Sequence, residues 1–287
     1  MPDNLPLDFP AYPRLPGHQL LSLDGTDAAA FAHAQFSSDV TALPLRHWQW
    51  SAWLNAKGRT IAVFQLLRVD PEQVLLVLAD GDADAIASQL QRFVFRRKVR
   101  IAVRQDLGVA GSFTAPEAAS GSAIAVDGET LELDLGSDAL PRTLRIGALH
   151  GAATPDDAAF ALAWRQADLR HGLPRLDAGQ REQWTPQQLG LDRLNGYSVK
   201  KGCYPGQEIV ARTHFLGKAK RALQLMRVAD GTASGAQVQQ NSGAIGTIAS
   251  VAGDLALAVL PLEIAADPLS VDGVEAVHLP LLDGLAR

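Results

Sequence analysis

The chain has 287 residues, of which 47% are hydrophobic and 20% charged, which provides enough apolar material for a sizeable core and disfavours intrinsic disorder. The net charge of −5, from 26 Lys and Arg against 31 Asp and Glu, argues against a protein that coats nucleic acid with its whole surface, and leaves a local basic patch open. The one cysteine, Cys203, excludes an intrachain disulfide and a Cys-rich zinc or iron–sulfur site built from this chain alone.

The N-terminal segment 1–17 carries five prolines and two acids where a secretory signal would have basic and then apolar residues. We expect residues 1–16 to form an arm on the surface. The longest apolar runs, 74–79 and 255–262, are far shorter than a membrane span and are typical of buried strands. We therefore expect a cytoplasmic protein that does not associate with membranes.

Hydrophobic patterns predict the elements of the first half of the chain. Strands are expected at 18–23, 48–54, 60–69, 73–79 and 98–105, helices at 27–36 and 82–95, and a hairpin with an Asp-Gly turn at 122–135. Trp48, Trp50 and Trp53 make one strand densely aromatic, which indicates core packing rather than a planar-ligand pocket.

The second half begins with a strong helical pattern at 154–172, where we expect Thr154 as N-cap, Pro155 at the first helical position and Gly172 at the end. From Val228 to Ala286 the chain has no Lys or Arg and breaks into short strands, which indicates a small β-barrel or sandwich. The order of elements predicts an α+β fold with antiparallel sheets. The expected divisions are a Pro-rich arm at 1–16, an α+β region at 17–222 and a β-barrel at 223–287.

The segment KKGCYPGQEIVARTHFLGKAKRA (200–222) is the most unusual stretch. Pro205 suits the first position of a short helix, which would leave Cys203 just outside a helix N-terminus, beside Lys200 and Lys201. A helix dipole and two ammonium groups both favour the thiolate over the thiol, so Cys203 is a candidate reactive thiol. The alternative, a small buried apolar residue, carries about equal weight.

Two stretches of this acidic chain are basic. Residues 85–105 contain no acid and six cations, namely Arg92, Arg96, Arg97, Lys98, Arg100 and Arg104. Residues 200–227 contain seven Lys or Arg and one Glu. If the two stretches converge, they form a positive cleft for an anionic ligand such as a polyglutamate tail, a phosphate or RNA. The alternative is that the arginines complement helix dipoles and lie over apolar surface.

The motif KGCYPGQE (201–208), followed by ARTHFLGKAKRAL, resembles the YgfZ family, whose members are folate-binding relatives of the glycine-cleavage T-protein, an aminomethyltransferase. Weaker similarities lie in FSSDVT (36–41), LNAKGR (54–59) and the Gly172-Leu173-Pro174 segment. Together these matches span about residues 20 to 225.

The resemblance implies a T-protein-like fold, in which two intertwined ferredoxin-like subdomains surround a folate-sized channel that the C-terminal barrel closes. It implies tetrahydrofolate or a derivative as cofactor, and a role with iron–sulfur assembly proteins or client enzymes in making or repairing clusters, which indirectly supports tRNA modification. Cys203 would be the functional thiol, able to supply one ligand of a transient shared iron–sulfur cluster. The implied folate-binding residues are Lys201, Gly202, Tyr204, Gly206, Gln207, Glu208, Arg212, Asp39 and Lys57.

The sequence departs from the T-protein where that enzyme places carboxylates. Ala62 and Val63 stand where it has two aspartates, and Arg170 stands where its glutamate contacts the pterin. Aminomethyl transfer is therefore disfavoured. Two alternatives remain open: a folate-dependent one-carbon transferase that uses Glu208, Asp39 or Asp168, and a tRNA-binding module on the basic surfaces.

Overall fold

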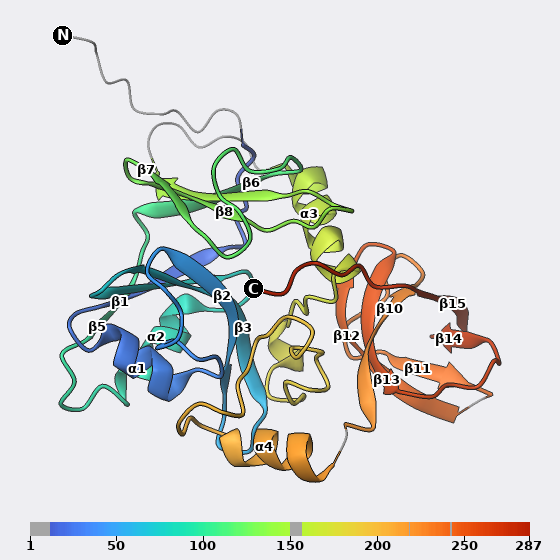
Figure 1. Cartoon of the computed structure of the whole chain (residues 1–287). Helices are drawn as coiled ribbons and strands as arrows, with labels where there is room; N and C mark the ends of the chain where they lie inside the picture. Colours follow the sequence, from blue (N-terminus) through green and yellow to red (C-terminus); the bar gives the residue numbers. More distant parts are fainter. Residues whose placement is uncertain (1–11, 150–156, 218, 242) are drawn as a thin grey trace.

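The computed structural model describes residues 12–149, 157–217, 219–241 and 243–287. Figure 1 shows two mixed α/β parts stacked on one side of the molecule and a β-barrel on the other. The C-terminal segment returns from the barrel to the centre, where the carbonyl of Leu285 accepts a 2.8 Å hydrogen bond from the Trp50 indole. Residues 280–287, here the C-terminal strap, therefore tie the barrel to the first sheet.

The first subdomain has a five-stranded antiparallel sheet in the order β2-β3-β4-β1-β5. Its elements are β1 (Gln19–Asp24), α1 (Ala28–Gln35), β2 (His47–Leu54), β3 (Thr60–Asp70), β4 (Gln73–Leu78), α2 (Ala83–Gln91) and β5 (Arg100–Val103). Without β2, the order β3-β4-β1-β5 and the path β1-α1-β3-β4-α2-β5 are those of a ferredoxin-like unit, to which β2 is added at the edge.

This sheet is buried on both faces, which explains its long apolar runs. Side chains alternate along a strand, so Leu21 and Leu23 pack under the helices while Leu20 faces the central core. Trp48 and Trp50 also lie in the central core, and Trp53 packs on the helix side. The expectation that these tryptophans serve core packing is confirmed.

The second subdomain has a four-stranded sheet in the order β6-β9-β8-β7, accompanied by α3. Its elements are β6 (Leu107–Ser112), β7 (Ala125–Asp127), β8 (Thr130–Asp134), β9 (Thr143–Ala148) and α3 (Ala158–Arg170). The end of the Pro-rich arm joins this sheet, because Arg14 bridges to Ala110 and the Leu15 amide donates to Val109. Leu15 is buried, so this part does not lie on the surface as expected, and residues 1–11 fall outside the described residues.

The C-terminal part is a closed six-stranded barrel in the order β10-β13-β12-β11-β14-β15. Its strands are β10 (Arg221–Arg227), β11 (Gln237–Gln240), β12 (Gly243–Ala252), β13 (Leu255–Pro261), β14 (Leu269–Val271) and β15 (Val274–Leu279). The expected α+β class and C-terminal barrel are confirmed. The expected domain boundary at 222/223 falls inside β10 and stays a prediction.

Two helices have other ends than the sequence predicted. The helix expected to reach residue 95 ends at Gln91, because the amides of residues 92–94 donate to carbonyls three residues earlier rather than four, and Phe95, with a φ of +42°, stops any continuation. The helix expected from Thr154 begins at Ala158, where the Asp157 side chain accepts a 2.9 Å hydrogen bond from the Phe160 amide. Thr154 and Pro155 themselves lie outside the described residues.

Candidate functional site

Residues 198–208, here the cysteine loop, lead into α4 (Gln207–Leu216). The N-cap of α4 is Gly206, with a φ of +75°, so Pro205 precedes the helix and the expectation that it opens the helix was wrong. A Cβ on Gly206 would lie 2.6 Å from the Asn55 oxygen and 2.6 Å from the Gly58 Cα. The cysteine loop therefore packs directly on the turn that carries Lys57, and only glycine allows this approach.

Lys201 points inward rather than toward the thiol, which corrects the expectation that its ammonium lies beside Cys203. Its Nζ donates to the carbonyls of His33, Phe36 (2.5 Å) and Ser38 (3.1 Å), and the side chain is buried. Burial lowers the pKa of Lys201 to about 8, against an opposing effect of Asp39. The ammonium thus ties the cysteine loop to carbonyls at the C-terminal end of α1, which otherwise lack helical partners.

Other hydrogen bonds close the cysteine loop on itself. The Tyr204 hydroxyl donates to the Ser198 carbonyl at 3.1 Å, and Gln207 Nε2 donates to the Lys201 carbonyl at 2.9 Å. Burial raises the pKa of Tyr204, and the nearby Tyr197 adds to this. Polar groups of the loop are therefore engaged, whereas the Cys203 side chain stays exposed.

The remaining predicted residues take different positions around the cysteine loop. Gly202 is exposed, as are Lys57, Glu208 and Arg212. Asp39 caps a turn, since its Oδ1 accepts from the Thr41 amide, from the Thr41 hydroxyl and from the Ala42 amide at 2.8–3.1 Å. These bonds outweigh partial burial and lower the pKa of Asp39.

His33 is a neighbour of the loop that the sequence did not indicate. A Cβ on Gly202 would lie 4.0 Å from His33 Nε2, and His33 Nδ1 lies 3.3 Å from Asp39 Oδ1. The structure thus gathers Asp39, His33, the Lys57 turn and the cysteine loop on one surface.

Asp168, a candidate base in the sequence, is locked in a buried ion-pair network. It is 1% exposed and binds Arg142 at 2.6 Å and Arg175 at 2.7 Å. Arg175 in turn pairs with Asp80 at the end of β4. Burial alone would raise the pKa of Asp168, but the two arginines lower it, so this carboxylate holds subdomains together and is unavailable as a base.

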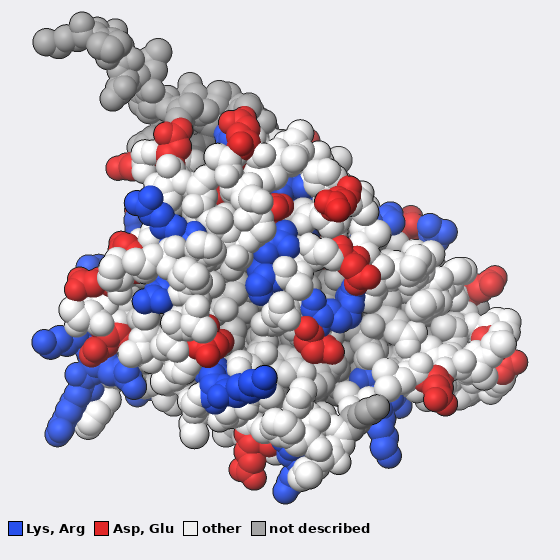
Figure 2. Space-filling view, in the orientation of Figure 1, with Lys and Arg blue, Asp and Glu red and all other residues white. Residues whose placement is uncertain are grey.

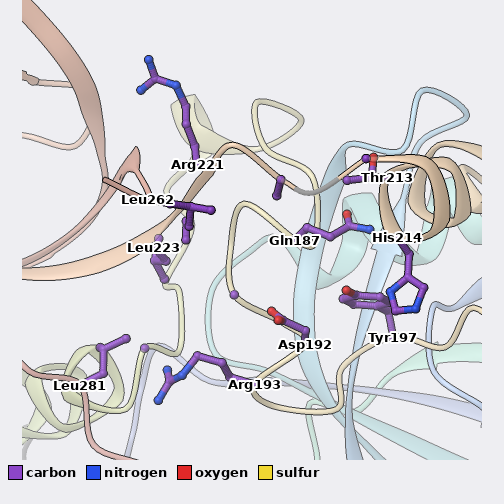
Figure 3. Close-up of a pocket in the computed structure, with 15 residues that line it drawn as sticks. Gln187, Asp192, Arg193, Tyr197, Thr213, His214, Arg221, Leu223, Leu262 and Leu281 are labelled. Atoms are coloured by element: carbon purple, nitrogen blue, oxygen red, sulfur yellow. The ribbon is translucent and has the colours of Figure 1, made fainter. Parts of the chain in front are cut away.

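A pocket of about 300 Å³ lies between α4, the turn at 187–197, the end of α3 and the start of the barrel (Figure 3). Its wall shares no residue with the predicted site. The residues that line it are Gly172, Gln187, Gly190, Asp192, Arg193, Tyr197, Thr213, His214, Gly217, Ala219, Arg221, Ala222, Leu223, Leu262 and Leu281. Of these, Gly172 was expected as a helix end, and the lining residues between Thr213 and Leu223 belong to the basic stretch 200–227, which was the one available signal.

The pocket combines one carboxylate, two guanidinium side chains and an apolar wall. Asp192 is exposed and points into the pocket in Figure 3. Burial, and then the Asp192 charge, raise the pKa of Tyr197 to about 12. Arg193 is held toward the C-terminal strap by hydrogen bonds to the carbonyls of His171 and Leu282 and to Asp283.

The pocket wall also contains an unused acceptor. Gln187 Nε2 donates to the Val210 carbonyl at 2.9 Å, while its Oε1 is buried without a partner in the described part of the chain. A ligand with N–H donors suits such a wall. The basic stretch 92–104 contributes nothing to this pocket, so the two basic segments do not converge there.

The described part of the chain shows neither a metal-binding cluster nor a membrane-spanning helix. Within the described ranges, no group of three or more His, Cys, Asp or Glu residues is arranged to hold a metal ion. No described helix is both long and apolar enough to span a membrane.

Comparison with known proteins agrees with the motif. No model of a known protein family matches the chain. The tRNA-modifying protein YgfZ of Colwellia psychrerythraea is 29% identical, over 71% of this chain and 67% of that protein. The crystal structure of the glycine cleavage system aminomethyltransferase T from Bartonella henselae matches with a TM-score of 0.70 at 15% identity, covering 94% of this chain and 84% of that one. In sequence the chain is thus similar to YgfZ, and it has the fold of the glycine-cleavage aminomethyltransferase.

Proposed function

We propose that the chain binds tetrahydrofolate or a derivative in the pocket at Asp192 and presents Cys203 as a functional thiol. In this role it supports iron–sulfur cluster assembly or repair in the cytoplasm, and thereby the iron–sulfur enzymes that modify tRNA. The likeness to YgfZ supports this role. The observation that carries the ligand proposal is the composition of the pocket wall, which offers a carboxylate and apolar surface that suit the ring system of a folate.

The pterin ring has N–H donors, which suit the exposed Asp192 carboxylate. The aromatic middle of a folate suits the apolar surface of Leu223 and Leu281. The Arg221 guanidinium points away from the pocket in Figure 3 and donates to the Ile245 carbonyl, so the anionic glutamate tail finds no cation inside the pocket. At about 300 Å³ the cavity is at the lower end of small-molecule sites, so it accommodates the bicyclic ring and leaves the tail toward solvent. Tetrahydrofolate, when bound, supplies a carrier for one-carbon units.

Cys203 is suited to work on a partner rather than alone. It is exposed at the tip of a loop whose other side chains are anchored, so a partner protein can reach the thiol. A single cysteine supplies one ligand, so a cluster bound to Cys203 takes its other ligands from a partner protein.

A one-carbon transferase is the weaker alternative, because the carboxylates proposed for it are occupied or remote from the pocket. Asp168 is bound by two arginines, Asp39 caps a turn, and neither residue lines the pocket, nor does Glu208. Asp192 is the carboxylate that the pocket offers.

A bulky residue at the pocket rim tests the ligand proposal. Leu262 lines the pocket and is 56% exposed, so Leu262→Trp narrows the cavity without disturbing the core. We expect calorimetric titration to give saturable tetrahydrofolate binding to the wild-type chain and at least tenfold weaker binding to Leu262→Trp. Leu216→Trp is the matched control, because Leu216 is exposed and does not line the pocket. Equal binding by wild type and Leu262→Trp would place the ligand elsewhere.

A further inference from the structure

Residues 92–100, here the Phe–Arg loop, join α2 to β5 and expose two aromatic rings among cations. Phe95 is 87% exposed and Phe93 49%, whereas Phe31, Phe36 and Phe64 of the same subdomain are fully buried. In Figure 2, Lys and Arg side chains gather at the lower left, over the segment that follows α2 in Figure 1. A cluster of this kind is unexpected on a surface whose net charge is negative.

The backbone of the Phe–Arg loop is fixed although its side chains are exposed. Val94 and Val99 are buried in the core under the helices. The Lys98 amide donates to Asp27 Oδ2 at 2.7 Å, and the Arg97 amide donates to the Val94 carbonyl at 2.9 Å. Phe95 is held at a φ of +42°, a conformation that costs a non-glycine residue energy and that often marks a functional position. The loop thus presents its rings in a preorganised form.

The cations of the Phe–Arg loop are free of acidic partners. Arg92, Arg96, Arg97, Lys98 and Arg100 are exposed, and within the described ranges none forms an ion pair. Arg104, by contrast, is paired with Asp106 at 2.6 Å and does not belong to the loop. Two acids adjoin the loop: Asp27, whose carboxylate already accepts the Lys98 amide, and Asp24, opposite Arg100 in the sheet.

We propose that the Phe–Arg loop binds single-stranded RNA, with bases stacked on Phe93 and Phe95 and phosphates on the surrounding cations. Aromatic rings in a basic surface are the usual means of binding unpaired nucleotides, because every base offers a flat face. The Arg96 guanidinium lies 5.3 Å from the centre of the Phe95 ring, which places a phosphate-binding group beside a stacking platform. Four of the five cations are arginines, whose planar groups both stack on bases and bind phosphate in two places.

The geometry of α1 connects this surface to the cysteine loop. Asp27 at the N-terminal end of α1 holds the Phe–Arg loop, and the carbonyls of His33 and Phe36 at the other end hold Lys201. The helix has eight residues, a length of about 12 Å at about 1.5 Å per residue. RNA on the Phe–Arg loop would thus lie one short helix away from Cys203. The proposal goes beyond folate binding, because the loop shares no residue with the pocket.

Fluorescence anisotropy of the full chain with a labelled RNA hairpin that has an unpaired loop tests this proposal. We expect binding to the hairpin, weaker binding to a fully paired RNA of equal length, and less affinity as salt rises. Phe95→Ala should weaken hairpin binding by about tenfold. The double variant Arg96→Ala, Arg97→Ala should lower the slope of log affinity against log salt by about 1.4 in magnitude. Matched controls are Phe215→Ala, another exposed ring, and Arg227→Ala on the barrel, both with unchanged binding.

Several outcomes would overturn the RNA proposal. These are no binding at low salt, equal affinity for paired RNA and hairpin, or unchanged binding by Phe95→Ala. Phosphatidylserine vesicles form a second arm, and a preference for vesicles over RNA would make the loop a lipid-binding surface instead. Tetrahydrofolate titration of each variant keeps the two proposals distinguishable, since none of the substituted residues lines the pocket.

Discussion

The cysteine loop and the pocket lie at α4 and differ in how their polar groups are used. In the cysteine loop the ammonium of Lys201, the hydroxyl of Tyr204 and the amide of Gln207 are all bound to carbonyls of the chain. In the pocket Asp192 points into open space, and Gln187 Oε1 has no partner in the described part of the chain. The difference supports the proposed division of roles, in which the loop holds one thiol rigidly and the pocket binds the ligand.

Among the variants that test this difference, Lys201→Met should reduce the stability of the chain most. It keeps an unbranched side chain and removes the hydrogen bonds that tie the cysteine loop to α1. Carbonyls of His33, Phe36 and Ser38 lose a charged donor, so we expect a loss of about 2 kcal/mol in the free energy of unfolding by urea at neutral pH. Lys200→Met is the matched control, because Lys200 is exposed and its loss should cost under about 0.5 kcal/mol. Equal stability of the two variants would show that the ammonium does not anchor the loop.

Replacing the carboxylate of the pocket should change ligand affinity and leave the cysteine loop intact. We expect Asp192→Asn to weaken tetrahydrofolate binding about tenfold, or about 1.4 kcal/mol, because a charged acceptor for the pterin donors is lost. Asp230→Asn is the control, since Asp230 is exposed and does not line the pocket. If calorimetry gives both variants the affinity of the wild type, Asp192 does not contact the ligand.

The buried ammonium also predicts a pH dependence of stability. The pKa of Lys201 is lowered from 10.5 in the unfolded chain to about 8 in the folded chain. Between pH 8 and pH 10 the unfolded chain therefore binds more protons than the folded chain, and this group makes stability rise with pH by at most about 1.4 kcal/mol per pH unit. Below pH 8 both states are protonated and the contribution is constant.

Urea denaturation between pH 8 and pH 10 checks whether stability rises with pH as predicted. The difference in unfolding free energy between the wild type and Lys201→Met should grow from pH 8 to pH 10. The raised pKa of Tyr197, about 12 against 10 in the unfolded chain, lowers the stability of both proteins alike near pH 10, so it cancels in the difference. A pH-independent difference between the two proteins would contradict a titrating Lys201.

The sequence predicted the elements well where local pattern decides. The runs at 60–69 and 73–79 became β3 and β4 almost residue for residue, since continuous apolar stretches in a sheet buried on both faces leave little choice. The motif also located the cysteine loop and indicated the similarity to YgfZ. It did not predict that Lys201 turns inward, because its carbonyl partners lie more than 160 residues away in the sequence.

The start of α4 and the pocket also depend on tertiary contacts that local sequence does not predict. Pro205 is a good local signal for a helix start, but contact with the turn at 55–58 requires a left-handed glycine at 206, and this tertiary contact decides. The pocket draws on α3, α4, the turn at 187–197, β10 and the C-terminal strap. Asp192 and Tyr197 have no distinguishing neighbours in sequence, so only the fold brings them together.

The smallest structural effect, and the most direct test of the division of roles, belongs to Cys203→Ala. Because the side chain is exposed and the anchors of the loop remain, stability should change by under about 0.5 kcal/mol. The decisive measurement pairs a tetrahydrofolate titration of this variant with iron–sulfur enzyme activity in cells whose own copy of the protein is replaced by it. We predict wild-type folate affinity together with loss of the supported enzyme activity. Full enzyme activity with Cys203→Ala, or a loss of folate affinity in this variant, would contradict a functional thiol that is separate from the ligand pocket.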